Sequence, residues 1–239
     1  MSFSALKHYF NHTISTRFLK VLLLIDVMFV VGHLIVVTLF QSEPSTLLLD
    51  AKGLGYPELF QYVKYSLVIA FSTYIVFAKK RYSYLPFIGL FVVLLLDDVF
   101  QIHSKASYFF AYRLKLHTLF GLKAVMYGQL VYIILLGSLS IILFRLFYRR
   151  TTINTKKTFT DIFILLVLFL FFGVGIDIIH QLFLNTPKIG SLLTILEEGG
   201  EMISLSVLVW YFFFLMFKVD EKRNFLKDCI LIKCCLKLN

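Results

Sequence analysis

The stretch FLKVLLLIDVMFVVGHLIVV, residues 18–37, decides the fold class of this chain. An α-helix rises about 1.5 Å per residue, so roughly 20 mostly apolar residues cross the hydrocarbon core of a bilayer. The stretch is too long to be a removable signal peptide, and Asp26 and His33 interrupt it. We therefore predict a membrane-spanning helix over residues 18–40.

Five further apolar stretches repeat this pattern along the chain. We predict spans over residues 57–78, 84–103, 119–148, 159–184 and 189–217. The composition agrees, because the chain is 59% hydrophobic and 16% charged, whereas about a quarter of the residues in a soluble domain are charged. The predicted fold is an all-α polytopic bundle of six transmembrane helices over residues 1–217, followed by a basic tail over residues 218–239.

The basic residues that flank the predicted spans give the chain an orientation. With the N-terminus inside, 17 of the 24 Lys and Arg residues lie on the inner side. They are Lys7, Arg17, Lys20, Lys79, Lys80, Arg81, Arg145, Arg149, Arg150, Lys156, Lys157, Lys218, Lys222, Arg223, Lys227, Lys233 and Lys237. We therefore predict cytoplasmic N- and C-termini in the cell (inner) membrane. Anionic lipid headgroups would meet the net charge of +10, so we expect membrane lipids as partners and no nucleic acid.

The cysteines of the chain, Cys229, Cys234 and Cys235, all lie in the predicted tail. Their spacing forms neither a disulfide framework nor a CxxC pair, and no CaaX box is present. Acylation of Cys234 or Cys235 beside the membrane stays open as an alternative, and we expect an unmodified tail. Two arrangements stay open for it: a basic amphipathic segment on the inner membrane surface, and a frayed terminus.

Seven of the fourteen acidic residues lie more than one turn inside a predicted span. They are Asp26, Asp97, Asp98, Asp177, Glu197, Glu198 and Glu201. A charged side chain at the centre of a membrane helix costs about 2.5–3.5 kcal/mol on insertion scales. Seven such groups must be paired, protonated, hydrated or bound to a cation, so they are the strongest functional signal in the chain.

Three of the predicted spans bring these acidic residues and two histidines to one depth, near the outer face. They are Asp97, Asp98 and His103 on the third span, Asp177 and His180 on the fifth, and Glu197, Glu198 and Glu201 on the sixth. We predict that these eight residues form one site. Asp26 lies deeper, and His33 lies about two turns above it on the same helix face.

Helical spacing supports part of this arrangement. Asp177 and His180 are three residues apart, and Glu197 and Glu201 are four apart, so each pair shares a helix face. Asp98 and His103 are five apart, which places them about 140° apart around an ideal helix. That pair converges only if the helix ends or bulges between them.

The glycines between the acidic residues of the sixth span predict a close contact. Gly199 and Gly200 separate Glu198 from Glu201, and small residues let another membrane helix approach closely. We expect a neighbouring helix to pack there.

A metal site is the leading hypothesis for the predicted cluster. Carboxylate and imidazole ligands suit zinc, iron or manganese. A mononuclear site would use His103, His180 and one or two carboxylates, and a remaining carboxylate would serve as general base. Carboxylate-bridged di-iron bundles need two acid-x-x-His units, and this chain supplies only Asp177-x-x-His180. We expect such a site to support hydrolytic or oxidative chemistry on a lipid-soluble substrate.

Two alternatives stay open. A proton or cation pathway would extend the cluster inward through Asp26 and His33, although the inner halves of the spans are apolar and show no inverted repeat of broken helices. A structural role would pair the carboxylates with basic residues of the outer loop. These are Lys105, Arg113, Lys115 and Lys123.

Three short stretches resemble a family of uncharacterised bacterial multi-pass membrane proteins. They are LLLDDVFQIHS (residues 94–104), LEEGGEM (196–202) and LLLDAKGLGYPELF (47–60). The shared motifs are an acidic pair followed by x4-His, and Glu-Glu-x-x-Glu-Met. The resemblance implies the same architecture and the same site residues, and it implies no activity. Ser104 stands where such proteins tend to carry Glu, and the His-x-x-x-His pair of alkaline ceramidase-like hydrolases is absent.

Overall fold

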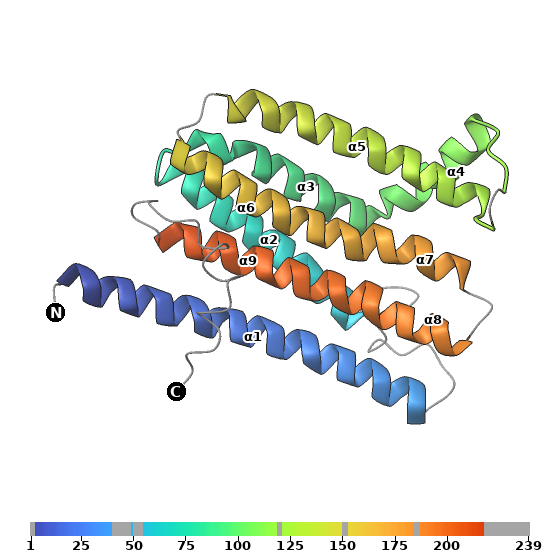
Figure 1. The fold of residues 1–239 in the computed structure, drawn as a ribbon, viewed down its shortest axis with the longest axis horizontal. Helices are drawn as coiled ribbons and strands as arrows, with labels where there is room; N and C mark the ends of the chain where they lie inside the picture. Colours follow the sequence, from blue (N-terminus) through green and yellow to red (C-terminus); the bar gives the residue numbers. More distant parts are fainter. Residues whose placement is uncertain are drawn as a thin grey trace.

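The structure is a computed structural model that describes residues 3–39, 49, 55–118, 121–149, 153–183 and 187–217. This part of the chain is all-helical (Figure 1). Six of its segments are long and apolar enough to cross a membrane: Thr13–Thr38, Tyr56–Phe77, Tyr82–Phe100, Ala124–Tyr148, Thr155–Leu182 and Ile189–Phe217. The predicted fold of six transmembrane helices is confirmed. The predicted tail with Cys229, Cys234 and Cys235 lies outside the described residues.

The α-helices of the described residues follow one another in chain order. They are α1 (Phe3–Leu39), α2 (Tyr56–Phe77), α3 (Leu85–Phe100), α4 (Ile102–Arg113), α5 (Ala124–Tyr148), α6 (Ile153–Leu170), α7 (Asp177–Leu182), α8 (Pro187–Thr194) and α9 (Gly200–Phe217). The 3₁₀ turn η1 (Tyr82–Tyr84) precedes α3, and two π-helical segments, η2 (Phe171–Ile176) and η3 (Ile195–Gly199), join α6 to α7 and α8 to α9. The fifth and sixth spans are therefore continuous helices, each with a π-helical segment in its length.

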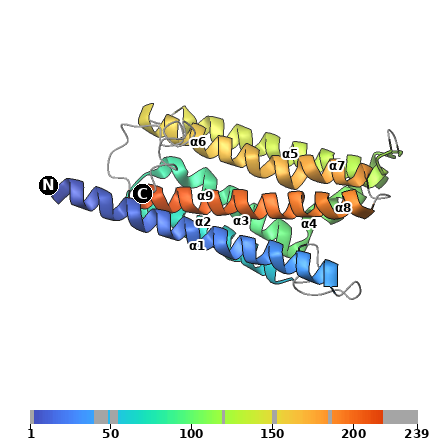
Figure 2. The ribbon, with the colours of Figure 1, turned by 60° about the horizontal axis from the view of Figure 1, so that its bottom comes forward.

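The last helix, α9, lies at the centre of the bundle. It packs against α1, α2 and α6, and α1 runs along it in both side views (Figures 1 and 2). Leu205, Leu208 and Phe212 of α9 have no exposed surface. On the periphery, α5 packs against α3 and α4 and exposes Ile134 and Leu139. Exposed apolar side chains of this kind suit a lipid environment, where tails are as apolar as the side chains.

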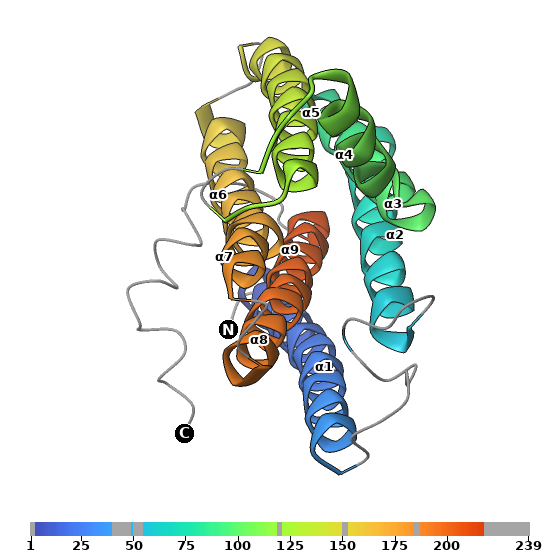
Figure 3. The same ribbon diagram turned by 90° about the vertical axis from the view of Figure 1, so that its right-hand side faces the viewer.

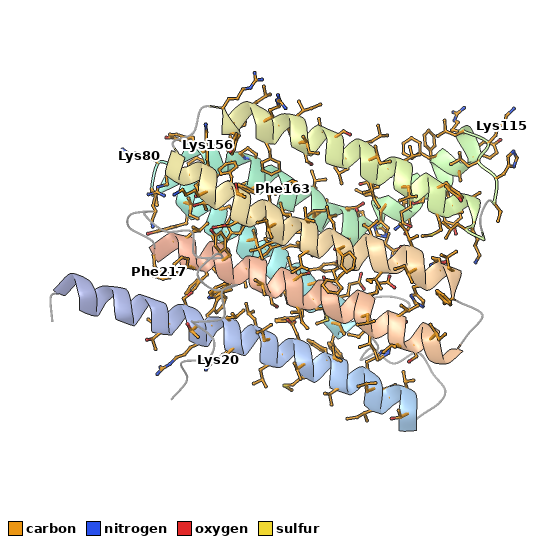
Figure 4. The ribbon with its side chains drawn as sticks, viewed as in Figure 1. Lys20, Lys80, Lys115, Lys156, Phe163 and Phe217 are labelled. Carbon is orange, nitrogen blue, oxygen red and sulfur yellow. The ribbon has the colours of Figure 1, made fainter. Side chains whose placement is uncertain are left out.

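The two ends of the bundle differ in what they carry. Lys80 and Lys156 lie at the end where α9 finishes, and Lys115 lies at the opposite end (Figure 4). The short helices α4, α7 and α8 gather at this second end (Figures 1 and 3). The predicted orientation makes it the outer end, and that orientation stays a prediction.

One element was not predicted from the sequence. The predicted spans 84–103 and 119–148 leave residues 104–118 as a loop, but helix α4 occupies most of that segment and packs along the start of α5. Gly128 permits this contact, because a Cβ atom there would lie 2.0 Å from the backbone oxygen of Ser107. The third span ends at Phe100 and the fourth begins at Ala124.

Candidate functional site

A break in the helix after Phe100 brings His103 back toward the acidic pair. Gln101 adopts a left-handed conformation with φ of 50°, which is uncommon for a residue with a side chain. Its N–H donates to the carbonyls of Asp97 and Asp98, closing α3 before α4 begins. The condition that the sequence set for the convergence of Asp98 and His103, a helix end between them, is met.

The reversal places His103 in direct contact with Asp97. The backbone N–H of His103 donates to Asp97 Oδ1 at 2.7 Å, and the ring Nδ1 lies 3.4 Å from Asp97 Oδ2. The hydrogen bond to Asp97 raises the pKa of His103, and the nearby charges of Asp98 and Asp177 act in the same direction against partial burial. The surroundings of His103 thus favour a positive charge.

Asp97, Asp98 and His103 form a group, hereafter the triad, that can meet at one ion. One ligand atom from each residue lies within 4.8 Å of the other two. Two ligands of one zinc ion lie at most about twice the bond length of 2.0–2.2 Å apart. Small side-chain rotations would therefore bring the triad to that geometry.

Two tyrosines hold the carboxylates of the triad. The Tyr132 hydroxyl on α5 donates to Asp97 Oδ1 at 3.0 Å, and Tyr65 on α2 hydrogen-bonds to Asp98. Partners of this kind orient the carboxylate ligands of metal sites. Both tyrosines were missed in the sequence, where abundant aromatic residues gave no signal to single them out.

The side chains of Asp177 and His180, both on α7, contact different partners. His180 Nδ1 lies 2.7 Å from Glu197 Oε2, so this ion pair joins α7 to η3. Asp177 accepts from Gln129 Nε2 of α5 at 3.1 Å and from Gln181 at 3.4 Å. Asp177, His180 and Glu197 therefore tie the outer ends of the helices together around the triad.

The two π-helical segments face each other. A Cβ atom on Gly200 would lie 2.2 Å from the Phe172 ring, and one on Gly173 would lie 3.2 Å from Glu201 Oε2. The predicted close approach at Gly199–Gly200 is thus present, and the neighbour is η2. Single π-helical turns inside α-helices are frequent at functional sites.

A cavity of about 350 Å³ opens beside the triad. Asp97, Asp98, His103 and Glu201 line its polar end. Most of the remaining lining is apolar and comes from α3, α5 and α6, with Leu94, Leu136 and Leu166 among its residues. Glu201 therefore lines the same cavity as the triad.

The deep carboxylate Asp26 is paired rather than free. Lys64 Nζ lies 2.5 Å from Asp26 Oδ1 and also donates to the Met202 carbonyl at 2.9 Å. Ser206 donates to Asp26 Oδ2 at 2.6 Å. Both charged side chains are fully buried. Lys64 was not predicted from the sequence, although a lysine eight residues into an apolar span was a visible signal.

Two other predicted residues lie apart from the triad. His33 Nδ1 accepts a hydrogen bond from the Leu49 N–H at 3.2 Å, so His33 holds the chain that follows α1. Glu198 lies half-buried in η3. Asp161, which was not predicted as a functional residue, accepts a hydrogen bond from the Tyr211 hydroxyl at 2.8 Å in the core.

If the carboxylates had only a structural role, we expected them to pair with basic residues of the predicted outer loop. Within the described residues, the ion pairs of the site join Asp97 to His103 and Glu197 to His180. None of these ion pairs involves Lys105, Arg113, Lys115 or Lys123. Arg113 instead lies over the Phe109 ring, 5.7 Å from its centre. Within the described residues, no ion pair therefore joins these four basic residues to the carboxylates of the site.

Comparison with known proteins adds a family and no activity. A family model described as "Domain of unknown function (DUF8692)" matches residues 21–217. The match covers all the site residues described above. Comparisons with curated proteins and with solved structures find no match.

Proposed function

Because the chain belongs to the DUF8692 family, whose description names no activity, we propose its function from the site itself. The protein binds a divalent metal ion through Asp97, Asp98 and His103, at the polar end of an apolar cavity. The metal supports hydrolytic or oxidative chemistry on a lipid-soluble substrate. The proposed location is the cell (inner) membrane, with the site near the outer face.

The observation that carries this proposal is the convergence of the triad on one point. One imidazole and two carboxylates are a ligand set that suits zinc, iron or manganese. The three ligand atoms come within 4.8 Å of one another, from two helices that the break at Gln101 folds together. Carboxylate oxygens from Asp97 and Asp98 at the same point favour a cation.

The other predicted ligands take supporting roles in this proposal. Glu201 opens into the same cavity and serves as a further ligand or as general base. Asp177, His180 and Glu197 hold α5, α7 and η3 around the ion. The apolar lining beneath the carboxylates favours a bound substrate over a path for protons or cations.

Metal content of the detergent-purified protein tests the proposal. The parent should carry one divalent ion per chain, after purification or after reloading with Zn²⁺, Fe²⁺ or Mn²⁺. His103→Ala should lose the ion, whereas His117→Ala, an exposed histidine in the same outer region, should keep it. Size-exclusion and circular dichroism profiles show that each variant is folded. A folded parent without metal after reloading rules the site out.

A further inference from the structure

The cavity beside the triad is long and has two chemically different ends. Its lining along α5 runs from Gln129 to Phe144, which is roughly 22 Å at 1.5 Å per residue. Carboxylates gather at the Gln129 end, and aromatic and aliphatic side chains fill the Phe144 end. A cavity of this shape matches a molecule with one polar end and one extended apolar chain.

The apolar part of the cavity opens sideways, toward the lipid. Four residues that line it also lie on the outer surface of the bundle: Ile141 is 58% exposed, Phe163 56%, Val167 49% and Leu170 45%. They belong to α5 and α6, and Phe163 is labelled on α6 in Figure 4. Within the described residues, α5 packs on α3 and α4 while α6 packs on α9, and the two share no broad contact. The opening therefore lies between α5 and α6.

The polar end decides which molecules would be retained. An alkyl chain gains little by moving from lipid into an apolar cavity, since lipid tails are as apolar as leucine. Selection must therefore come from the head group. Three carboxylates, Asp97, Asp98 and Glu201, face this end, and Lys64 is already paired with Asp26. Carboxyl oxygens therefore dominate this end, and an uncharged head group that hydrogen-bonds to them fits it without placing a further anion beside them.

We propose that the cavity binds a single-chain amphiphile that enters from the bilayer between α5 and α6. Its alkyl chain lies between α3, α5 and α6, and its uncharged, oxygen-bearing head group, such as a carbonyl or a hydroxyl, meets the triad and Glu201. The inference rests on the proposed function for the metal that the head group meets. The chain-binding part stands on the cavity alone.

Photolabelling in phosphatidylcholine vesicles tests the proposal. The probe is hexadecanamide carrying a diazirine midway along its chain, and the comparison probe is hexadecyl phosphate with the same diazirine. The amide should label peptides that contain Ile141 and Phe163, and excess unlabelled amide should compete. The phosphate should label at least about tenfold less, which corresponds to 1.4 kcal/mol of discrimination.

A matched pair of variants on α5 makes the test specific to the cavity. Gly137 lines the cavity, and a Cβ atom there meets nothing within 4 Å, so Gly137→Phe places a ring in the space that the alkyl chain would occupy. Leu139 is 56% exposed on the same helix, and Leu139→Phe is the control. Labelling should fall about tenfold in the first variant and stay unchanged in the second.

Metal content, measured in parallel, separates this inference from the proposed function. If the parent protein shows saturable labelling but binds no metal, the binding site for the alkyl chain is supported and the proposed metal site is refuted. Metal binding with labelling that does not compete, or that Gly137→Phe leaves unchanged, overturns the amphiphile site alone. Equal labelling by the phosphate probe overturns the assignment of an uncharged head group.

Discussion

Lys64 and Asp26 form an ion pair that neither lipid nor water reaches. Removing water from two charges is expensive, and their attraction offsets this only while both are present. The pair also binds the Met202 carbonyl and the Ser206 hydroxyl of α9. It thereby joins α1 and α2 to the central helix α9.

We predict that Lys64→Met lowers the free energy of unfolding by about 3–5 kcal/mol, because it leaves Asp26 buried without its counter-charge. The double variant Asp26→Leu, Lys64→Met should recover most of this loss. Reversible unfolding in mixed detergent micelles measures both values. Lys80→Met is the control, since Lys80 is exposed at the end of the bundle, and should change little.

An undiminished stability in Lys64→Met would show that Asp26 is hydrated or protonated rather than paired. The double variant also addresses the transport alternative. Loss of Asp26 alone would reduce any activity by destabilising the fold, so it cannot distinguish a pathway from a support. Activity retained in the stable double variant would exclude Asp26 from a proton route.

His103 predicts a pH dependence of stability in the metal-free protein. Its pKa is raised above the ordinary value of 6.5 by the hydrogen bond to Asp97. The charged form therefore stabilises the fold fully below the unfolded pKa, and this contribution is lost as the pH rises through the folded pKa. In chelator-treated protein, the unfolding free energy should fall from about pH 6.5 upward, and His103→Gln should flatten that slope.

The exposed His117 supplies the matched control for this titration. His117→Gln should leave the slope as in the parent, because the His117 ring lies on the surface and the interaction with Asp97 is intact. A slope that His103→Gln leaves unchanged would mean that other groups of the bundle set the pH dependence.

Some features of the site could be predicted from the sequence and others could not. Charged residues inside apolar spans were recognisable from composition, and they include all three members of the triad. The break at Gln101 was not recognisable, because glutamine is not a residue that usually takes a positive φ. The partners Tyr65 and Tyr132 depend on which helices become neighbours, and hydropathy carries no such information.

At the scale of elements, α4 packs against α5 at Gly128, where the two backbones are too close for a side chain on α5. The Ser107 oxygen lies 2.0 Å, and the Ala111 nitrogen 3.0 Å, from where a Cβ atom of Gly128 would stand. All the close atoms belong to the α4 backbone, so they cannot turn aside as a side chain can. His103 lies in the first turn of α4 and moves with it.

We predict that Gly128→Ala pushes α4 away from α5, lowers stability by about 1–3 kcal/mol, and weakens metal binding by displacing His103. Gly137→Ala on the same helix is the control, because its Cβ atom meets nothing within 4 Å. That control should gain up to about 1 kcal/mol from helix propensity. Thermal unfolding and metal titration measure both effects, and a Gly128→Ala protein that matches Gly137→Ala contradicts the packing of α4 on α5.

Elements that span the membrane were predictable from length and hydropathy, and elements that shape the site were not. Helix α4 is only half apolar, IHSKASYFFAYR, so it resembles a loop in a hydropathy plot. The π-helical segments η2 and η3 contain about one more residue per turn than an α-helix, and the amino-acid composition of a segment does not predict this difference. Their glycines were the one signal, and it predicted a close approach without predicting the helix type.

At the scale of the whole molecule, hydropathy does not decide which helix lies inside. The fifth span has a mean hydropathy of 2.9 with 22% of its most apolar window buried, whereas the sixth has 1.8 with 56% buried. Because lipid accepts apolar side chains as readily as protein does, the most apolar helices have no reason to be central. The central α9 instead carries Glu201 and Ser206, which need partners inside the bundle.

The orientation of the whole bundle would determine which side supplies the proposed metal. The excess of basic residues at the end near Lys80 and Lys156 predicts that this end is cytoplasmic, and Lys115 marks the opposite end (Figure 4). The test uses single cysteines in a variant whose three native cysteines are replaced by serine. The two cysteines are introduced as Tyr82→Cys and His117→Cys. Both residues are exposed, and neither is a Lys or Arg, so the substitutions leave the basic residues that set the orientation unchanged.

In right-side-out spheroplasts, a membrane-impermeant maleimide should label His117→Cys and leave Tyr82→Cys unlabelled until the membrane is opened. This result would place α4, the triad and the polar end of the cavity near the outer face, so an impermeant chelator should strip the metal from intact spheroplasts. The reverse labelling would invert the bundle and make the cytoplasm the source of the metal. The contacts of the triad lie within the protein. That outcome would therefore change the side of the membrane from which a metal ion reaches the site, and it would leave the geometry of the site unchanged.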